Sequence, residues 1–114
     1  GKTNILPGKV TDQNAVLVKG TPVSVNTDQH EVGADVKLCI RPEKFTMSGD
    51  TAGLQVHVKA SIFMGASWLY SVESDMGELF VTQPNTGTAG FGRGDVAYLS
   101  WEEGALTVFG GAQA

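Results

Sequence analysis

The chain is short of metal-binding side chains. Its 114 residues include one cysteine, Cys39, and two histidines, His30 and His57. A single cysteine excludes an intramolecular disulfide, and a reducing compartment is the expected setting. A structural zinc site needs four Cys or His ligands, and three such side chains far apart in the sequence do not supply them. The sequence therefore predicts no metal site of this kind.

Positive charge is sparse and scattered. Eight Lys and Arg residues stand against twelve Asp and Glu residues, which gives a formal net charge of −4. Proteins that bind nucleic acids gain affinity from clustered Lys and Arg, so we expect no nucleic-acid partner. Aromatic rings can also stack on bases. Without a basic groove, we instead expect core or interface packing from the four aromatic candidates, which are Trp68, Tyr70, Tyr98 and Trp101.

Long apolar runs and catalytic motifs are also missing. The longest nearly apolar run, residues 62–70, is far shorter than the roughly 20 residues of a membrane-spanning helix. No Gly-x-Ser-x-Gly nucleophile motif occurs. Residues 1–3 read Gly-Lys-Thr, like the end of a phosphate-binding P-loop, but Pro7 and Gly8 would break the helix that a P-loop requires. We expect neither catalytic activity nor a bound cofactor or metal in this chain.

What is present is a β pattern in an ordinary globular composition, with 41% apolar and 18% charged residues. Apolar and polar residues alternate most clearly over residues 54–62, which places one face of a strand in a core. The length suits one domain, residues 1–114, with an all-β, OB-like barrel or sandwich fold. The alternation and the turns predict nine strands, at 5–10, 15–19, 22–25, 36–41, 54–62, 68–73, 79–83, 96–101 and 106–109.

The segments between these strands predict the organisation of the fold. Residues 75–77 and 102–104 have the chemistry of hairpin turns. An irregular stretch, residues 44–53, divides the domain into two small lobes. Residues 84–94 are rich in Gly, Thr and Asn and predict a long surface loop.

Carboxylates gather around the 75–77 turn. Glu73, Asp75 and Glu78 are close in sequence and are weak candidates for binding a cation or a basic ligand. The alternative is a charged, solvated turn that keeps the strands soluble. We favour the solvated turn, because charges in turns usually serve no other purpose.

The tetrad Ile40-Arg41-Pro42-Glu43 follows a predicted strand. It resembles a motif of the TOBE domain, the transport-associated OB-like module at the C-terminus of many ABC import ATPases. Four further segments resemble this family. Residues 1–10 have Asn4 before an apolar residue, residues 62–70 contain Gly65, and residues 95–101 end in Trp101. Residues 83–85, which end in Asn85, are similar to a Gln-x-Asn segment of the polyamine group.

The resemblance covers nearly the whole chain. It implies the C-terminal regulatory and dimerisation domain of an ABC transporter ATP-binding subunit, closest to those for putrescine and spermidine import. ATP and Mg²⁺ would belong to a preceding ATPase domain, and residues 1–3 would be the remnant of its linker. The implied partners are a second ATPase subunit, as a homodimer, and transmembrane permease subunits. The implied location is the cytoplasmic face of the cell membrane.

Two alternatives stay open. Pro42 fixes the direction of the chain, and Arg41 can make a bidentate contact with a carboxylate, with Glu43 as a candidate partner across the lobes or across a dimer. Arg41 and Glu43 can equally pin a single loop. The alternative function is a sensor for a small ligand, either an oxyanion such as molybdate or a polyamine. The start of the chain also resembles the molybdate-binding version of the family, although Gly-Lys-Thr stands where that version has Ser-Ala-Arg.

Overall fold

Short alternating segments pair into antiparallel strands over most of the chain. The computed structural model describes residues 3–12, 14–87 and 90–110, which form ten strands and one 3-10 helix. All nine predicted strands are present within two residues of their predicted ends, so the all-β prediction is confirmed. Gly1 and Lys2, from the P-loop-like start, lie outside the described residues, and Thr3 precedes a strand and not a helix.

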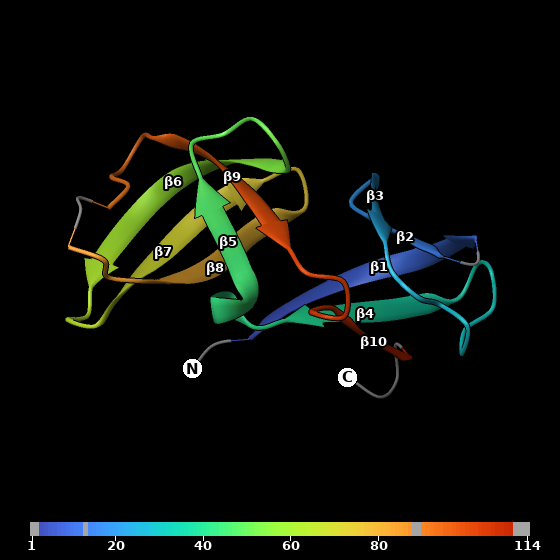
Figure 1. Ribbon diagram of the computed structural model, residues 1–114. Helices are drawn as coiled ribbons and strands as arrows, with labels where there is room; N and C mark the ends of the chain where they lie inside the picture. The colour runs from blue at the N-terminus through green and yellow to red at the C-terminus, as the bar shows by residue number, and fades with distance from the viewer. Residues whose placement is uncertain (1–2, 13, 88–89, 111–114) are drawn as a thin grey trace.

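The strands form two sheets, which we call lobe 1 and lobe 2 (Figure 1). Lobe 1 has the order β10-β4-β1-β2-β3, with β1 (Asn4–Asp12), β2 (Ala15–Val18), β3 (Thr21–Ser24), β4 (Asp35–Ile40) and β10 (Thr107–Gly110). Lobe 2 has the order β5-β9-β6-β7-β8, with β5 (Phe45–Ser48), β6 (Leu54–Phe63), β7 (Ser67–Ser74), β8 (Gly77–Pro84) and β9 (Val96–Trp101). The helix η1 (Pro42–Lys44) lies between β4 and β5.

The two lobes are copies of one topology. Strands β1 to β4 correspond to β6 to β9, and each lobe takes its fifth strand from the other half of the chain. Both copies carry a β-bulge, after Val10 in β1 and after Val58 in β6. Beside the bulge, Gly33 donates its N–H to the Val10 carbonyl at 2.7 Å, and Gly94 donates to the Val58 carbonyl at 2.9 Å. The chain is therefore an internal repeat whose halves exchange their last strands.

Two crossovers carry this exchange. The first joins β4 of lobe 1 to β5 of lobe 2, and Lys44 donates its N–H to the Arg41 carbonyl at 3.0 Å. The second joins β9 of lobe 2 to β10 of lobe 1, where Ala105 donates its N–H to the Glu102 carbonyl at 3.1 Å. The prediction that residues 102–104 close a hairpin is therefore wrong, because the strands on either side belong to different sheets.

The stretch predicted to be irregular contains a strand. Residues 45–48 form β5, which pairs with β9 and buries Phe45 and Met47. The prediction for residues 44–53 is wrong in this part, because four alternating residues are too few to stand out next to Gly49 and Gly53. The following residues 49–53 are a surface turn, as expected.

Only part of the clearest alternating segment faces the core. Val56 and Val58 of β6 are buried, but beyond the bulge Ile62 is 55% exposed and Phe63 is 58% exposed. A bulge adds one residue to one strand and so shifts which side chains face inward. The expectation that residues 54–62 present one continuous apolar face to the core is wrong past this point.

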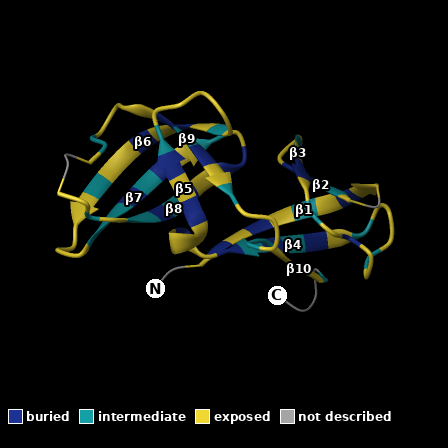
Figure 2. Ribbon diagram, in the orientation of Figure 1, coloured by how far each residue is buried: buried dark blue, intermediate teal, exposed yellow. Residues whose placement is uncertain are grey.

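The buried side chains lie on the strands of both lobes, and most connecting loops are exposed (Figure 2). Together they form one hydrophobic cluster that includes residues from each sheet. The largest fully buried members are Tyr70, Leu38, Ile40, Leu79 and Leu99. Residues 85–87 and 90–95 form the predicted loop after β8, although its first predicted residue, Pro84, ends the strand and Phe91 packs inward.

Asn4 joins the two lobes. Its side chain, 4% exposed, donates from Nδ2 to the Phe80 carbonyl at 2.8 Å and accepts at Oδ1 from the Phe80 N–H at 2.8 Å. Nδ2 also donates to the Ile40 carbonyl at 3.3 Å. Phe80 lies on β8, an edge strand of lobe 2. The Asn4 amide therefore pairs with this edge as a neighbouring strand would, and so satisfies backbone groups at the junction.

We expect Asn4→Ala to lower the free energy of unfolding by about 2–4 kcal/mol, because it removes both hydrogen bonds between the Asn4 amide and the Phe80 backbone at a partly buried site. Urea unfolding followed by circular dichroism measures this. Gln55→Ala, at an exposed position on β6, is the matched control and should change stability by less than about 0.5 kcal/mol. Equal effects of the two substitutions would contradict the role of Asn4.

Candidate functional site

The tetrad at residues 40–43 forms the first crossover. Ile40 and Pro42 are buried, whereas Arg41 and Glu43 are exposed. Pro42 begins η1, where its fixed φ suits a helical turn. Among the described residues, no ion pair forms between Arg41 and Glu43 or with any other side chain. The apolar members thus anchor the crossover, and the charged members point to the surface and are not paired to each other.

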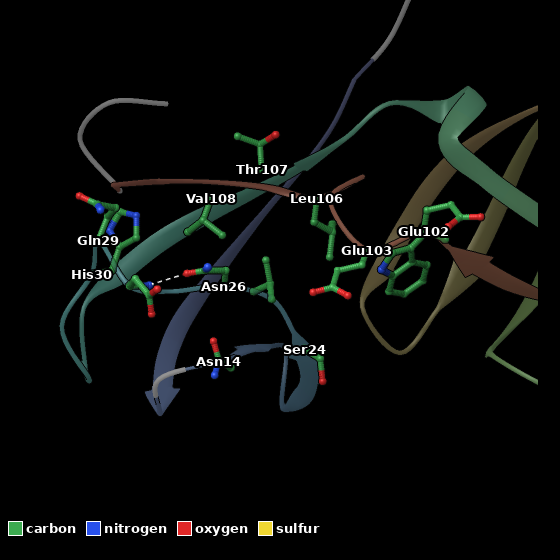
Figure 3. A pocket seen from close by; sticks show the side chains of 14 residues that line it. Asn14, Ser24, Asn26, Gln29, His30, Glu102, Glu103, Leu106, Thr107 and Val108 are labelled. Carbon is green, nitrogen blue, oxygen red and sulfur yellow. Dashed lines mark hydrogen bonds between the residues drawn. The ribbon is translucent and has the colours of Figure 1, made fainter.

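The second crossover borders a broad hollow lined mostly by lobe 1 and its loops, which we call the seam hollow (Figure 3). Leu106 and Val108 lie on one side and Asn14 and Ser24 on the other (Figure 3). Its volume of about 1090 Å³ is at the upper end of ligand pockets. The charged side chains that line it are Asp28, Glu102 and Glu103, and the described lining contains no Lys or Arg.

A second hollow of about 660 Å³, the crossover hollow, lies where the two crossovers meet. It brings Arg41 and Lys44 of the first crossover together with Glu102 and Glu103 of the second. Cys39 also lines it, and burial raises the pKa of this thiol, with the nearby Lys37 charge opposing the effect in part. The thiol is therefore less readily ionised than a free cysteine and is a poor nucleophile.

Sequence reasoning missed the part of this region that belongs to the second crossover. The sequence pattern predicts only a turn at Glu102 and Glu103 and gives no role to Asp28. The doublet of carboxylates directly after Trp101 is the one sequence signal that marks the place. Its proximity to Arg41 depends on the strand exchange, which no local pattern predicts.

Gly65 and Asn85 hold the β6–β7 turn. Gly65 has φ +85°, which favours glycine at this position. Asn85 donates from Nδ2 to the Gly65 carbonyl at 3.0 Å and from its N–H to the Ala66 carbonyl at 2.9 Å. Trp101, on β9, packs edge-on against Phe45 at a ring distance of 5.8 Å. These motif residues therefore contribute to the fold of lobe 2, and Trp101 also lines the seam hollow.

The strands, the tetrad and the crossovers agree with a known family. The sequence profile of the TOBE domain matches residues 38–109, more than half of the chain. This chain belongs to the TOBE domain family. No curated protein matches the sequence.

One solved structure similar to this TOBE domain is that of the cytoplasmic molybdate-binding protein ModG, in a PEG-grown crystal form with molybdate bound. The TM-score is 0.81, and the match covers 93% of this chain and 94% of that chain. The two sequences are 14% identical. At this identity the likeness shows a shared fold, and it confirms the OB-like fold expected for a TOBE domain.

The aromatic candidates of the TOBE domain pack within lobe 2. Trp68 and Tyr70 are stacked with their ring centroids 6.3 Å apart, and Tyr70 is buried. The Tyr70 hydroxyl accepts the Phe91 N–H at 3.1 Å, which ties the loop after β8 to the core. Tyr98 is half-buried on β9. The expectation of packing roles agrees with these contacts for Trp68 and Tyr70, and with the Phe45 contact for Trp101.

Two of the three candidate cation ligands already contact a cation. Lys59 lies 3.0 Å from the Glu78 carboxylate and 3.5 Å from that of Glu73. The Glu78 carboxylate also accepts from the Ser71 hydroxyl at 2.9 Å. Asp75 is exposed in the β7–β8 turn. In residues 3–12, 14–87 and 90–110, no three His, Cys, Asp or Glu side chains are grouped to hold a metal ion. No helix in those ranges is long and apolar enough to span a membrane.

The hydrogen bond and the charge of Glu78, with a smaller contribution from Glu73, raise the pKa of Lys59 above its usual 10.5. We expect Glu78→Gln to lower this pKa toward the usual value, as measured by NMR titration of the Lys59 side chain. A raised folded-state pKa stabilises the fold below pH 10.5, and this stabilisation is lost as the pH rises through the folded-state pKa. Glu31→Gln, at an exposed loop position, is the control and should leave the Lys59 titration unchanged. An unchanged titration in Glu78→Gln would contradict the pairing.

Proposed function

We propose that this TOBE domain is the C-terminal accessory domain of an ABC import ATPase subunit, and that the parent transporter imports putrescine or spermidine. The domain works by contact and has no turnover of its own. ATP and Mg²⁺ bind in the ATPase domain of the parent chain. The partners are a second ATPase subunit and the membrane permease subunits, at the cytoplasmic face of the membrane. The ordered motifs of the sequence and the family match support this proposal.

The observation that carries the proposal is the geometry of the tetrad. Pro42 is buried and fixes the crossover, while Arg41 and Glu43 are exposed at the surface. In a two-fold symmetric dimer the same patch meets itself, so a contact between Arg41 of one copy and Glu43 of the other is made twice. Arg41 and Glu43 are complementary in this arrangement, because guanidinium and carboxylate groups form paired hydrogen bonds.

We expect Arg41→Glu to weaken self-association of the intact ATPase subunit by about tenfold or more, since it replaces an attractive interface pair with a repulsive one. Sedimentation equilibrium measures the dimer constant. The double substitution Arg41→Glu with Glu43→Arg should restore association, because it reverses both charges. Arg93→Glu, an exposed charge reversal on the loop before β9, is the control.

Two results would contradict the proposal. Unchanged association in Arg41→Glu would remove the contact role from the tetrad. Hydrolysis of ATP by this chain alone, above the rate in buffer, would contradict an accessory role without turnover.

A small-ligand sensor is the second candidate. The shared fold with a protein solved with molybdate bound supports it, as do the two hollows beside the second crossover. Arg41 and Lys44 are the cationic groups that would hold an oxyanion in the crossover hollow. The carboxylates of Glu102 and Glu103 repel an anion in the crossover hollow. The same two side chains attract a polyamine in the adjacent seam hollow.

Isothermal titration calorimetry with molybdate, sulfate, putrescine and spermidine tests this candidate. If an oxyanion binds at the crossover hollow, Lys44→Met should reduce its affinity at least tenfold, whereas Lys9→Met, which removes an exposed cation on β1, should not. Binding should weaken with added salt because the contacts are open to solvent. The absence of heat with all four solutes would contradict the sensor and leave the contact role.

A further inference from the structure

Lobe 2 is closed by a side chain. Its edge strands, β5 and β8, are the two ends of the sheet order β5-β9-β6-β7-β8. Met47 of β5 donates its N–H to Gln83 Oε1 at 3.1 Å, and Gln83 Nε2 donates to the Phe45 carbonyl at 2.6 Å. The Gln83 amide on β8 therefore pairs with the β5 edge and closes the sheet on itself. A closed sheet offers no edge to another strand.

Lobe 1 has the same strand order without the closure. Its edge strands are β3 and β10, and no ladder pairs them in the described part of the chain. Residues of both edges, Ser24 of β3 and Thr107 and Val108 of β10, line opposite sides of the seam hollow (Figure 3). The hollow occupies the place between the edges that Gln83 bridges in lobe 2. Lobe 1 is therefore an open version of the same barrel.

Backbone groups of both edges face this opening. Val25 donates its N–H to the Asn14 carbonyl, so the alternation of an antiparallel strand directs the N–H and C=O of Ser24 away from β2. On the other edge, Val108 of β10 pairs with Leu38 of β4. In lobe 2, Met47 of β5 pairs with Leu99 of β9 in the same way, so Val108 and Met47 are equivalent positions of the repeat.

Because Met47 directs its N–H off β9 toward Gln83, the repeat directs the N–H of Val108 off β4 into the hollow. Among the described residues, neither Ser24 nor Val108 has a hydrogen-bond partner on this side. The opening is thus lined on both sides by backbone donors and acceptors that suit an added strand.

The negative charge of the seam hollow determines which kind of added strand fits it. Asp28, Glu102 and Glu103 line it without a Lys or Arg, and half-buried Leu106 and Val108 provide an apolar surface. The edge strands of this chain, β3 (Thr-Pro-Val-Ser) and β10 (Thr-Val-Phe-Gly), carry no basic residue, so a second copy of either would leave the carboxylates without partners. We infer that the seam hollow of lobe 1 binds an extended basic peptide segment of a partner protein as an added β-strand.

The added strand has a defined chemistry. Its backbone pairs with Ser24 on one edge and Val108 on the other, its apolar side chains contact Leu106 and Val108, and its Lys or Arg side chains reach Glu102 and Glu103. Neither Arg41 nor Glu43 lines the seam hollow, although Glu102 and Glu103 also line the adjacent crossover hollow beside Arg41. Peptide binding and the proposed dimer contact are measured by separate experiments, so the failure of one does not decide the other.

The test is fluorescence anisotropy with a labelled ten-residue peptide of alternating Val and Lys. We expect saturable binding that weakens with salt. A peptide with Glu in place of Lys should bind at least tenfold more weakly. The Val-Lys peptide with alternate backbone nitrogens methylated keeps its charge but loses strand pairing, and it should also bind at least tenfold more weakly. Equal binding of the methylated peptide would overturn the inference, because attraction to the carboxylates alone would then explain it.

Two variants locate the site. Glu102→Gln with Glu103→Gln should reduce affinity at least tenfold and flatten the salt dependence, whereas Asp50→Asn with Asp75→Asn, two exposed turn positions in lobe 2, should not. Val108→Pro removes the outward N–H from an edge position where proline is tolerated, and it should abolish binding. If Val108→Pro does not fold, slowed amide exchange of Ser24 and Val108 in the wild-type chain on peptide addition is the deciding measurement. Unchanged exchange, or formation of a dimer through the hollow, would contradict the inference.

Discussion

The structure depends on how the exposed edges of its sheets find hydrogen-bond partners. Backbone N–H and C=O groups that lose water without gaining a partner cost about 1–3 kcal/mol each, so each edge near the core needs a solution. At both edges of lobe 2 the solution is a side-chain amide. Asn4 pairs with Phe80, and Gln83 pairs with the backbone of β5. One primary amide carries both a donor and an acceptor, which is why Asn and Gln can replace a strand here.

These two amides have different consequences for the architecture. Asn4 begins β1 of lobe 1 and reaches β8 of lobe 2, so its contact fixes one lobe against the other. Gln83 acts within lobe 2 and completes its barrel. The strand exchange adds a covalent connection at each crossover, because the fifth strand of each lobe is supplied by the other half. The tetrad therefore lies where the chain must leave one lobe for the other, and buried Ile40 and Pro42 leave Arg41 and Glu43 at the surface.

Local patterns were sufficient for the strands and insufficient for their arrangement. Alternation predicts nine strands because apolar residues recur at every second position in them, but it misses β5, whose four residues pair with β9. Residues 102–104 have hairpin chemistry, but the strand exchange places β9 in lobe 2 and β10 in lobe 1, so the two strands do not pair. The exposure of Ile62 depends on the bulge at Lys59, which leaves no mark in the apolar pattern. Asn4 and Arg41 were found by resemblance, whereas Glu102 near Arg41 required the three-dimensional fold.

The internal repeat explains how one fold can provide both stability and binding. The two lobes have the same order of strands, but in lobe 2 Gln83 closes the sheet and the stacked Trp68 and Tyr70 pack inside it. In the part of the chain that the structure describes, lobe 1 has no such closure, and its edges face the seam hollow beside the acidic second crossover. A closed lobe keeps its geometry without a partner, and an open lobe has backbone groups available for one. The difference between two copies of one motif therefore separates the part of the domain that holds the fold from the part that is available for contact.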